Sequence, residues 1–209
     1  MIQKVTPAVM EEFAFNILVG GTSHTGKSTL SASLATAFNY EVLSTDKMAR
    51  HPGRPWPHAR PHVAEFYRNL SADSIHTFLL NHHENLWPSI KRLVEDRLAA
   101  KISCIVEGSA LRPEYLAELA RPQNMCICLY ASAELIQKRI YANSHYADLP
   151  PELRSLVDAF LERSVRDNEA NALAAKQHGI QLIDVADHTA FAHLRSKLIG
   201  GDRSRILKM

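Results

Sequence analysis

Short apolar runs alternate with longer amphipathic stretches along most of this chain. Continuous apolar runs are typical of strands that are buried on both faces of a sheet, since a half-buried strand alternates apolar and polar positions. Helical stretches separate the successive runs, so the pattern predicts a parallel sheet with helices on both faces, a three-layer α/β fold. The expected strands are residues 15–19, 40–44, 102–106, 125–130 and 180–185.

Apolar residues recur at helical spacing in the segments between these strands. Pro88 lies inside the longest segment, and we expect it to kink or split that helix near Trp87. Ser132 and Thr189 are suitable N-caps for two further helices, and Gly179 stops the helix before the fifth strand. The expected helices are residues 27–38, 74–100, 132–142, 150–177 and 189–199.

One segment fits neither the helical nor the strand period. Residues 51–62 read HPGRPWPHARPH, with four prolines and one tryptophan. Proline restricts the backbone and removes a hydrogen-bond donor, so we expect a loop. Two interpretations stay open: a rigid surface connection, or a stiff cationic loop that contacts an anionic or planar ligand.

Composition favours one globular domain. The chain has 209 residues, of which 46% are hydrophobic and 22% are charged, so it can bury a core without disulfides or a structural metal. We expect a single domain over residues 1–201 and a flexible basic tail over residues 202–209. The net charge of +2 is too small to indicate a nucleic-acid-binding protein, and the oligomeric state stays open.

The apolar runs and the cysteines predict a cytoplasmic protein. No apolar run reaches the roughly 18 residues of a transmembrane helix, and residues 1–7 lack the apolar stretch of a secretory signal. Cys104, Cys126 and Cys128 lie inside apolar runs without the spacing of zinc ligands. We therefore expect reduced, buried thiols.

The most specific motif follows the first expected strand. Residues 21–28 read GTSHTGKS, which matches the phosphate-loop pattern G-x-x-x-x-G-K-[ST] without a gap. The two glycines permit a close approach of the backbone to a phosphate, and the amides at the start of the following helix attract the anion. The nucleotide-binding candidates are Gly21, Ser23, His24, Thr25, Gly26, Lys27, Ser28 and Thr29.

Two side chains of the loop have expected roles in chemistry. We expect Lys27 to reach the β- and γ-phosphate oxygens and to neutralise charge that grows during phosphoryl transfer. We expect Ser28 to coordinate Mg²⁺ through its hydroxyl group. A glycine-rich turn without this function would not need Lys and Ser at these positions, so the motif predicts nucleotide binding.

The loop and its strand–loop–helix context resemble the nucleoside monophosphate kinase-like branch of P-loop kinases. This branch includes shikimate kinase, chloramphenicol phosphotransferase, the zeta toxins and 2-phosphoglycerate kinase. The resemblance covers nearly the whole chain, although only the loop is highly specific. It implies a parallel sheet in the strand order 2-3-1-4-5, ATP and Mg²⁺ as cofactors, and transfer of the γ-phosphoryl group to a hydroxyl or phosphate of a small acceptor.

Two carboxylates follow expected strands, where ligands bind in open α/β sheets. The resemblance implies that Asp46 contacts the acceptor hydroxyl, as general base or through Mg²⁺; the alternative is a helix cap. It also implies that Glu107 holds Mg²⁺ with Ser28, although the branch more often has Asp there. A role for Glu107 in orienting substrate, or a purely structural role, stays open. Arg112 is expected to pair with Glu107 or with substrate.

Arginines before the fifth strand are candidates for a lid. The resemblance implies that Arg163 and Arg166, in a lid segment of about residues 143–178, close over the phosphates and stabilise the transferred charge. The alternative is that both form surface ion pairs, Arg163 with Asp167 and Arg166 with Glu162.

Two further candidates have weaker sequence signals. Arg139, on the helix before the lid, is a third arginine for the phosphates. The resemblance also implies that residues 184–188 form a backbone loop that holds the adenine ring, a role that leaves little trace in side-chain types.

The expected acceptor site has a basic surround, which suggests an acceptor with a carboxylate or phosphate group. Trp56 would either stack on a ring of the acceptor or plug its own loop. A nucleoside or sugar derivative and a phosphorylated acid both remain candidates. The basic residues are Lys47, Arg50, Arg54, Arg60 and Arg112, of which we select Arg54, Arg60 and Arg112 as substrate-binding residues.

A small-molecule kinase is favoured over two other classes. A nucleotide-hydrolysing switch or assembly factor would use the same loop with water as acceptor, but the sequence has no clear N-K-x-D guanine motif. A sensor without chemistry would not need Lys27, Ser28, Asp46 and Glu107 together. We therefore expect nucleotide and a small acceptor as partners, with no membrane or nucleic acid.

Overall fold

The computed structural model describes residues 14–48 and 52–187, together with Thr189, Ala192, Leu194 and Ser196. The expected basic tail at residues 202–209, most of the last expected helix and Arg50 lie outside the described residues.

The strands form one parallel sheet whose order is β2-β3-β1-β4-β5, as the resemblance implied. Each expected strand is present, with its ends shifted by one or two residues. β1 lies at the centre, so the loop that follows it opens at the middle of the sheet edge. The strands are β1 (Asn16–Gly20), β2 (Glu41–Ser44), β3 (Cys104–Glu107), β4 (Asn124–Tyr130) and β5 (Gln181–Asp184).

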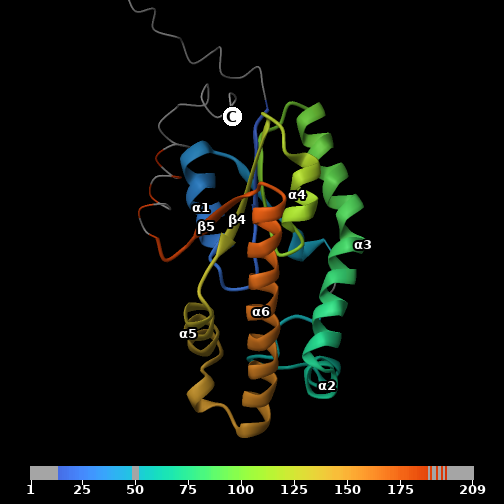
Figure 1. Cartoon of the computed structure of the whole chain (residues 1–209), viewed down its shortest axis with the longest axis vertical. Coiled ribbons are helices and arrows are strands. Elements are labelled where there is room, and N and C mark those ends of the chain that lie inside the picture. Colours follow the sequence, from blue (N-terminus) through green and yellow to red (C-terminus); the bar gives the residue numbers. More distant parts are fainter. Residues whose placement is uncertain are drawn as a thin grey trace, which may run out of the picture.

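Helices cover both faces of this sheet. Figure 1 shows α1 on one side and α3, α4 and α6 on the other, which confirms the predicted three-layer arrangement. The α-helices are α1 (Lys27–Phe38), α2 (Pro61–Asn69), α3 (Ala72–Ala99), α4 (Pro113–Leu119), α5 (Ala133–Ser144) and α6 (Pro151–Gln177). Two short 3₁₀ helices are η2 (Thr45–Lys47) and η3 (Tyr146–Asp148).

Strand side chains alternate between two apolar cores. Leu18, Val106 and Cys128 face the core that contains Trp87 of α3, while their neighbours along each strand face the core that contains Leu34 of α1. Cys126 packs against the first core beside Cys128, as expected from their spacing, and burial raises the pKa of the Cys126 and Cys128 thiols to about 12. Both sheet faces are therefore closed, and ligands have access only at its ends.

A third core holds a helical extension beyond the carboxyl ends of the strands. Trp56, Tyr67, Ile75 and Phe160 belong to this core, together with Ile140 of α5. In Figure 1 the long helices α3 and α6 run past the strands into this half, where α2 and α5 pack beside them. The extension places side chains from these helices opposite the loop after β1.

The helix α3 continues through Pro88, so of the two predicted outcomes, a kink or a split near Trp87, the split does not occur. Ile75 and Leu79 before the proline, and Ile90 and Val94 after it, are all buried on one stripe. Packing on both sides of Pro88 offsets the roughly 3 kcal/mol that an interior proline costs a helix.

The helices of the described residues were also compared with the length and hydropathy of a membrane span. None of these described helices combines the length and the apolar composition that a membrane-spanning helix requires.

Two helices, α2 and α4, were not expected from the apolar periodicity. Each begins with a proline at its first position, Pro61 in α2 and Pro113 in α4, preceded by an arginine in extended conformation. A proline at this position needs no hydrogen-bond partner and has the right backbone angle. The proline was thus the sequence signal for the start of each helix. α4, however, has only seven residues and is too short to show a helical period of apolar positions.

The close contact of Gly20 with the turn after β3 generates a test of the packing. A Cβ at Gly20 would lie 2.1 Å from the Leu111 carbonyl oxygen, so Gly20→Ala should lower the unfolding free energy by roughly 2 to 3 kcal/mol. Gly179→Ala is the matched control, because its Cβ meets no atom within 4 Å and only its positive φ of 67° costs about 1 kcal/mol. Urea unfolding measures both values. Equal losses would show that the contact with Leu111 does not constrain β1.

Candidate functional site

The phosphate loop connects the end of β1 to the start of α1. Gly21 (φ 126°) and Gly26 (φ 97°) adopt backbone angles that side chains rarely allow. A Cβ at Gly21 would also lie 2.6 Å from the Leu129 carbonyl oxygen, so glycine is required there for packing against β4. His24 is the non-glycine residue of this loop with positive φ, at 65°.

Two carbonyl groups of this loop accept hydrogen bonds from basic side chains, whereas its backbone amides remain unpaired. The Thr22 carbonyl accepts a hydrogen bond from Lys27 Nζ at 2.7 Å. The His24 carbonyl accepts one from Arg139 Nη1 at 2.8 Å, so this weaker candidate does contact the loop. In the described part of the chain, no backbone hydrogen bond uses the amides of residues 23–28. Unpaired amides at a helix N-terminus form a ready site for an anion.

Lys27 lies between these amides and a group of carboxylates. Its side chain is buried, and this burial lowers its pKa, while Asp46, Glu107 and Asp167 act in the opposite direction. A lysine in this position supplies positive charge close to any phosphate that the loop binds.

Ser28 and Glu107 form a pair of oxygen ligands beside the loop. Ser28 Oγ donates a hydrogen bond to Glu107 Oε2 at 3.2 Å. Glu107 ends β3 beside Val19 of β1, and its side chain is only 5% exposed. Hydroxyl and carboxylate oxygens are the ligands that Mg²⁺ prefers, so these residues fit the expected metal.

Asp46 lies in η2, directly after β2, and its side chain is exposed. It makes no capping hydrogen bond in η2, whose N-cap is Ser44, so the alternative role as a helix cap is not observed. Asp46 and Ser23 of the phosphate loop line the same cavity. The carboxylate is therefore close to the place where a nucleotide would end.

Arg163 reaches the loop from α6. Its guanidinium group lies 3.5 Å from Ser23 Oγ and covers the ring of Phe160 at 4.4 Å. Arg163 is 9% exposed, so it is not on a solvated surface, and the ion pair with Asp167 that was the alternative to a lid role is not formed. Burial against Phe160 holds its positive charge toward the loop.

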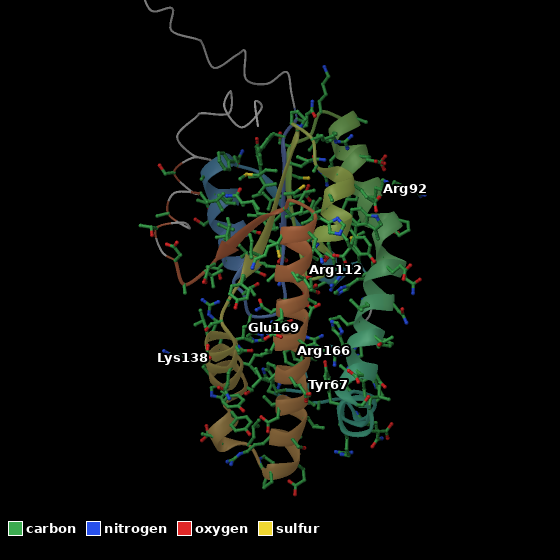
Figure 2. All side chains as sticks on the ribbon, viewed as in Figure 1. Tyr67, Arg92, Arg112, Lys138, Arg166 and Glu169 are labelled. Carbon is green, nitrogen blue, oxygen red and sulfur yellow. The ribbon has the colours of Figure 1, made fainter. Side chains whose placement is uncertain are left out.

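Arg166 does not reach the loop. It forms a surface ion pair, as in the alternative to the lid role, but its partner is Asp73 in the first turn of α3 and not Glu162. Figure 2 shows Arg166 between α6 and α3. The two arginines that sequence spacing places on one helix face thus have different partners.

Arg112 is held in a buried ion-pair network. Its guanidinium donates to Asp167 Oδ1 at 2.7 Å and to Glu114 Oε1 at 2.6 Å, and it does not pair with Glu107 as expected. Arg112 is 4% exposed. Burial raises the pKa of Asp167, but His76 and the positive charge of Arg112 together hold it well below its usual range. Arg112 therefore joins the turn after β3 to α6.

The cavity next to the loop is the candidate acceptor site. Its lining includes Ser23 and Asp46, together with His83 of α3 and Ser109 of the turn after β3. The remaining polar or charged lining residues are Thr45, Arg54, His82 and Arg163, and apolar walls come from Leu79, Leu86, Ala110 and Phe160.

Sequence reasoning missed His83 and Ser109. His83 Nε2 lies 3.3 Å from Ser109 Oγ, and His83 is only 1% exposed. One signal was present, because His83 falls on the apolar stripe of α3 between Leu79 and Trp87. A histidine on a buried stripe needs a polar partner, but the sequence could not name Ser109 as that partner.

The proline-rich segment is only partly a surface connection. Trp56 is buried, packs edge-to-face against Phe160 at 4.9 Å, and donates to Asn143 Oδ1 at 3.1 Å. Trp56 therefore plugs its loop. Arg54 Nη1 also donates to Asn143 Oδ1 and lines the cavity, whereas Arg60 is exposed and lies at the start of α2.

The loop after β5 carries the expected adenine-binding segment. Asp184 Oδ1 accepts from the Ala186 amide at 2.9 Å, and Asp187 Oδ1 accepts from the Thr189 amide at 2.9 Å. His188 lies outside the described residues. The two aspartates thus brace a turn at the edge strand of the sheet.

Comparison with known families decides the class of this chain. A family model described as an AAA domain matches residues 17–154, a range that contains the phosphate loop, Asp46 and Glu107. The chain belongs to this AAA domain family. The match covers most of the sheet and the first part of α6.

A comparison with solved structures supports the fold of this AAA domain at a TM-score of 0.50. A gluconokinase from Sinorhizobium meliloti aligns over 94% of this chain and 95% of that chain, with 20% identity and a TM-score of 0.50. A shikimate kinase from Acinetobacter baumannii in complex with shikimate aligns over 94% and 98%, with 17% identity and a TM-score of 0.49. The likeness to the first shows the fold, so the expected resemblance to P-loop kinases is confirmed at that level.

A curated relative of the AAA domain is part of a much longer protein. An uncharacterised protein from Dictyostelium discoideum is 29% identical over 191 residues, which covers 83% of this chain and 22% of that protein. The chain thus spans about a fifth of the length of this relative.

The buried His83 makes the stability of the AAA domain depend on pH. Burial lowers the pKa of His83 from 6.5 to about 3, so below pH 6.5 the unfolded chain binds a proton that the folded chain does not. Between pH 7.5 and pH 5 this should remove roughly 2 kcal/mol of unfolding free energy, and His83→Gln should abolish that part of the slope.

Urea unfolding at several pH values measures this slope. His178→Gln is the control, because His178 is exposed at the end of α6. Parallel pH profiles for wild type and His83→Gln would contradict the assignment.

Proposed function

We propose that this protein is an ATP-dependent kinase that transfers the γ-phosphoryl group to a hydroxyl or phosphate of a small anionic acceptor. One observation carries the proposal: a single cavity is lined by Ser23 of the phosphate loop and by Asp46, beside the buried Lys27. A switch that uses water as acceptor needs no such cavity next to its loop.

The loop amides and Lys27 would bind the β- and γ-phosphates of ATP, and the loop after β5 would hold the adenine ring. Ser28 and Glu107 would hold Mg²⁺, which supplies neutralising charge on the phosphates when bound. Because Glu107 already accepts a hydrogen bond from Ser28, we assign it to the metal site and not to the acceptor, although its side chain is longer than that of the more common aspartate.

Asp46 is the proposed general base. The acceptor oxygen attacks the γ-phosphorus, the bond from that phosphorus to the oxygen bridging to the β-phosphate breaks, and ADP leaves. The proton of the acceptor hydroxyl passes to the Asp46 carboxylate, which is free of capping bonds. Arg54 would attract the anionic group of the acceptor, and Arg163 would stabilise the charge on the transferred group.

We further propose that residues 1–201 act as one catalytic domain and that residues 143–178 form its lid. Of the lid arginines, Arg163 takes the catalytic role. Arg112 supports the site through Asp167, and Arg60 is not needed for acceptor binding. The three free cysteines are consistent with a reducing, cytoplasmic compartment.

Acceptor-dependent ADP formation tests the proposed function. Purified protein with ATP and Mg²⁺ should release ADP faster when a small-molecule cell extract is added, and mass spectrometry should find a phosphorylated product. Lys27→Ala should abolish this turnover without unfolding the protein. ADP release at the same rate with and without extract would instead identify a nucleotide-hydrolysing switch.

Arg163→Ala and Arg166→Ala form a matched pair for the lid. Arg163→Ala should lower kcat by about a hundredfold or more, because its contact strengthens as charge moves in the transition state. Arg166→Ala should leave kcat within about twofold, since its partner is the exposed Asp73. Steady-state kinetics on the two variants decide the matter, and equal effects would contradict the assignment of Arg163 alone.

A further inference from the structure

The lining of the cavity contains polar side-chain atoms that have no hydrogen-bond partner. His83 is 1% exposed and lines the cavity, yet within the described residues its Nδ1 has no hydrogen-bond partner. Thr45 is equally buried and lines the same cavity, and its Oγ1 also lacks a partner there. Arg163 Nε is a third such atom in the lining. Native proteins leave few buried polar groups unpaired, so three around one cavity indicate a ligand that supplies hydrogen bonds.

Ser109 adds a hydroxyl group to this polar lining of the cavity. Its Oγ lies 3.3 Å from His83 Nε2, and Ser109 is only partly buried. A hydroxyl group has one donor and two acceptor positions, so Ser109 retains capacity for a second partner while it contacts His83. His83 and Ser109 together therefore present a fixed, neutral hydrogen-bonding pair.

The imidazole of His83 carries no charge near neutral pH. Burial lowers its pKa to about 3, and Arg112, His82 and Arg163 lower it further, while Asp167 acts in the opposite direction. A neutral imidazole has one donor and one acceptor nitrogen. It suits a hydroxyl group, whereas an anion such as carboxylate is bound better by a cation.

We propose that His83 and Ser109 determine the specificity for the acceptor by binding one of its hydroxyl groups that does not react. The acceptor is therefore a small molecule with several hydroxyl groups and with one carboxylate or phosphate group. This inference rests on the proposed kinase function and narrows its acceptor. The reacting hydroxyl lies at Asp46, and the second hydroxyl lies at the His83–Ser109 pair on the same cavity.

The anionic group of the acceptor belongs at Arg54. This guanidinium lines the cavity, and among the described residues it forms no ion pair; its hydrogen-bond acceptor is the neutral Asn143. Arg163 is directed to the loop and Arg112 is neutralised by Asp167. Because the proposed role of Arg163 is with the transferred phosphate, Arg54 is the lining cation left for the acceptor, and it accounts for one anionic group.

A planar acceptor such as a nucleoside fits this cavity less well. Trp56, the ring that might have stacked on a base, is 7% exposed and packs against Phe160 and His24. Phe160 lines the cavity but already has the Arg163 guanidinium over its ring. The His82 ring also lines the cavity, but it is stacked on Phe78 at a centroid distance of 6.4 Å.

The first test compares pools of acceptors in the ADP assay. One pool holds sugar acids (gluconate, ribonate), and a second holds sugar phosphates (glucose phosphate, ribose phosphate). Three control pools hold uncharged polyols (sorbitol, ribitol), acids with one hydroxyl (lactate, hydroxyhexanoate) and nucleosides (adenosine, cytidine). We expect turnover with the first or second pool, which also distinguishes carboxylate from phosphate, and a polyhydroxylated anion as the product from cell extract.

The pools separate this inference from the proposed function. If extract drives ADP formation but the product is a nucleoside phosphate or the ester of a mono-hydroxy acid, the kinase stands and the inference is overturned. The same holds if only the control pools are active. If extract drives no ADP formation, the kinase proposal itself fails.

The second test uses variants of the hydroxyl-binding pair. For the identified acceptor, wild type should prefer it over its deoxy analogue by about a hundredfold or more in kcat/KM, because the analogue leaves the pair without a partner. Ser109→Ala and His83→Leu should reduce this ratio to within about tenfold, and His178→Gln should not change it. Ser109→Ala removes one oxygen and keeps the test valid if His83→Leu fails to fold. A purely structural role would lower both rates together and leave the ratio unchanged, which would overturn the inference.

Discussion

The buried ion pair between Arg112 and Asp167 fixes the helix on which the rest of the site depends. Asp167 also lies 3.8 Å from His76 of α3, so one carboxylate contacts α3 and the turn after β3 from its place on α6. Breaking such a pair by removing one partner typically costs about 3 to 5 kcal/mol, because the other charge stays buried. One helical turn before Asp167, Arg163 is thereby held with its guanidinium at the phosphate loop.

The same pair keeps the cavity suitable for an anion. Without Arg112, Asp167 would be an unpaired buried negative charge on α6, four residues after Arg163, and it would oppose the binding of a carboxylate or phosphate. With Arg112 against it, the charges that face the cavity are the Asp46 carboxylate and the guanidinium groups of Arg54 and Arg163. The cavity lining thus combines these charged groups with the hydroxyl groups of Thr45 and Ser109 and the imidazole of His83.

Much of the fold and the nucleotide half of the site could be predicted from residue order. The loop over residues 21–28 and the carboxylate Glu107 depend on strand ends, and strand ends in a parallel sheet meet at one edge. The acceptor half could not be predicted in this way. Arg163 and Arg166 look equivalent by helical spacing, yet one meets Ser23 and the other Asp73, because the two neighbours come from different, distant segments.

By itself, the sequence determined the strands, the helix ends marked by Ser132 and Gly179, and the phosphate loop, because these depend on neighbours a few residues apart. The tertiary structure decided which side chains meet across the cavity. His83 and Ser109 are 26 residues apart, and no local pattern links them. Their contact exists because the core between α3 and the sheet sets the distance from a helix stripe to a strand end, and that distance is a property of the packed protein.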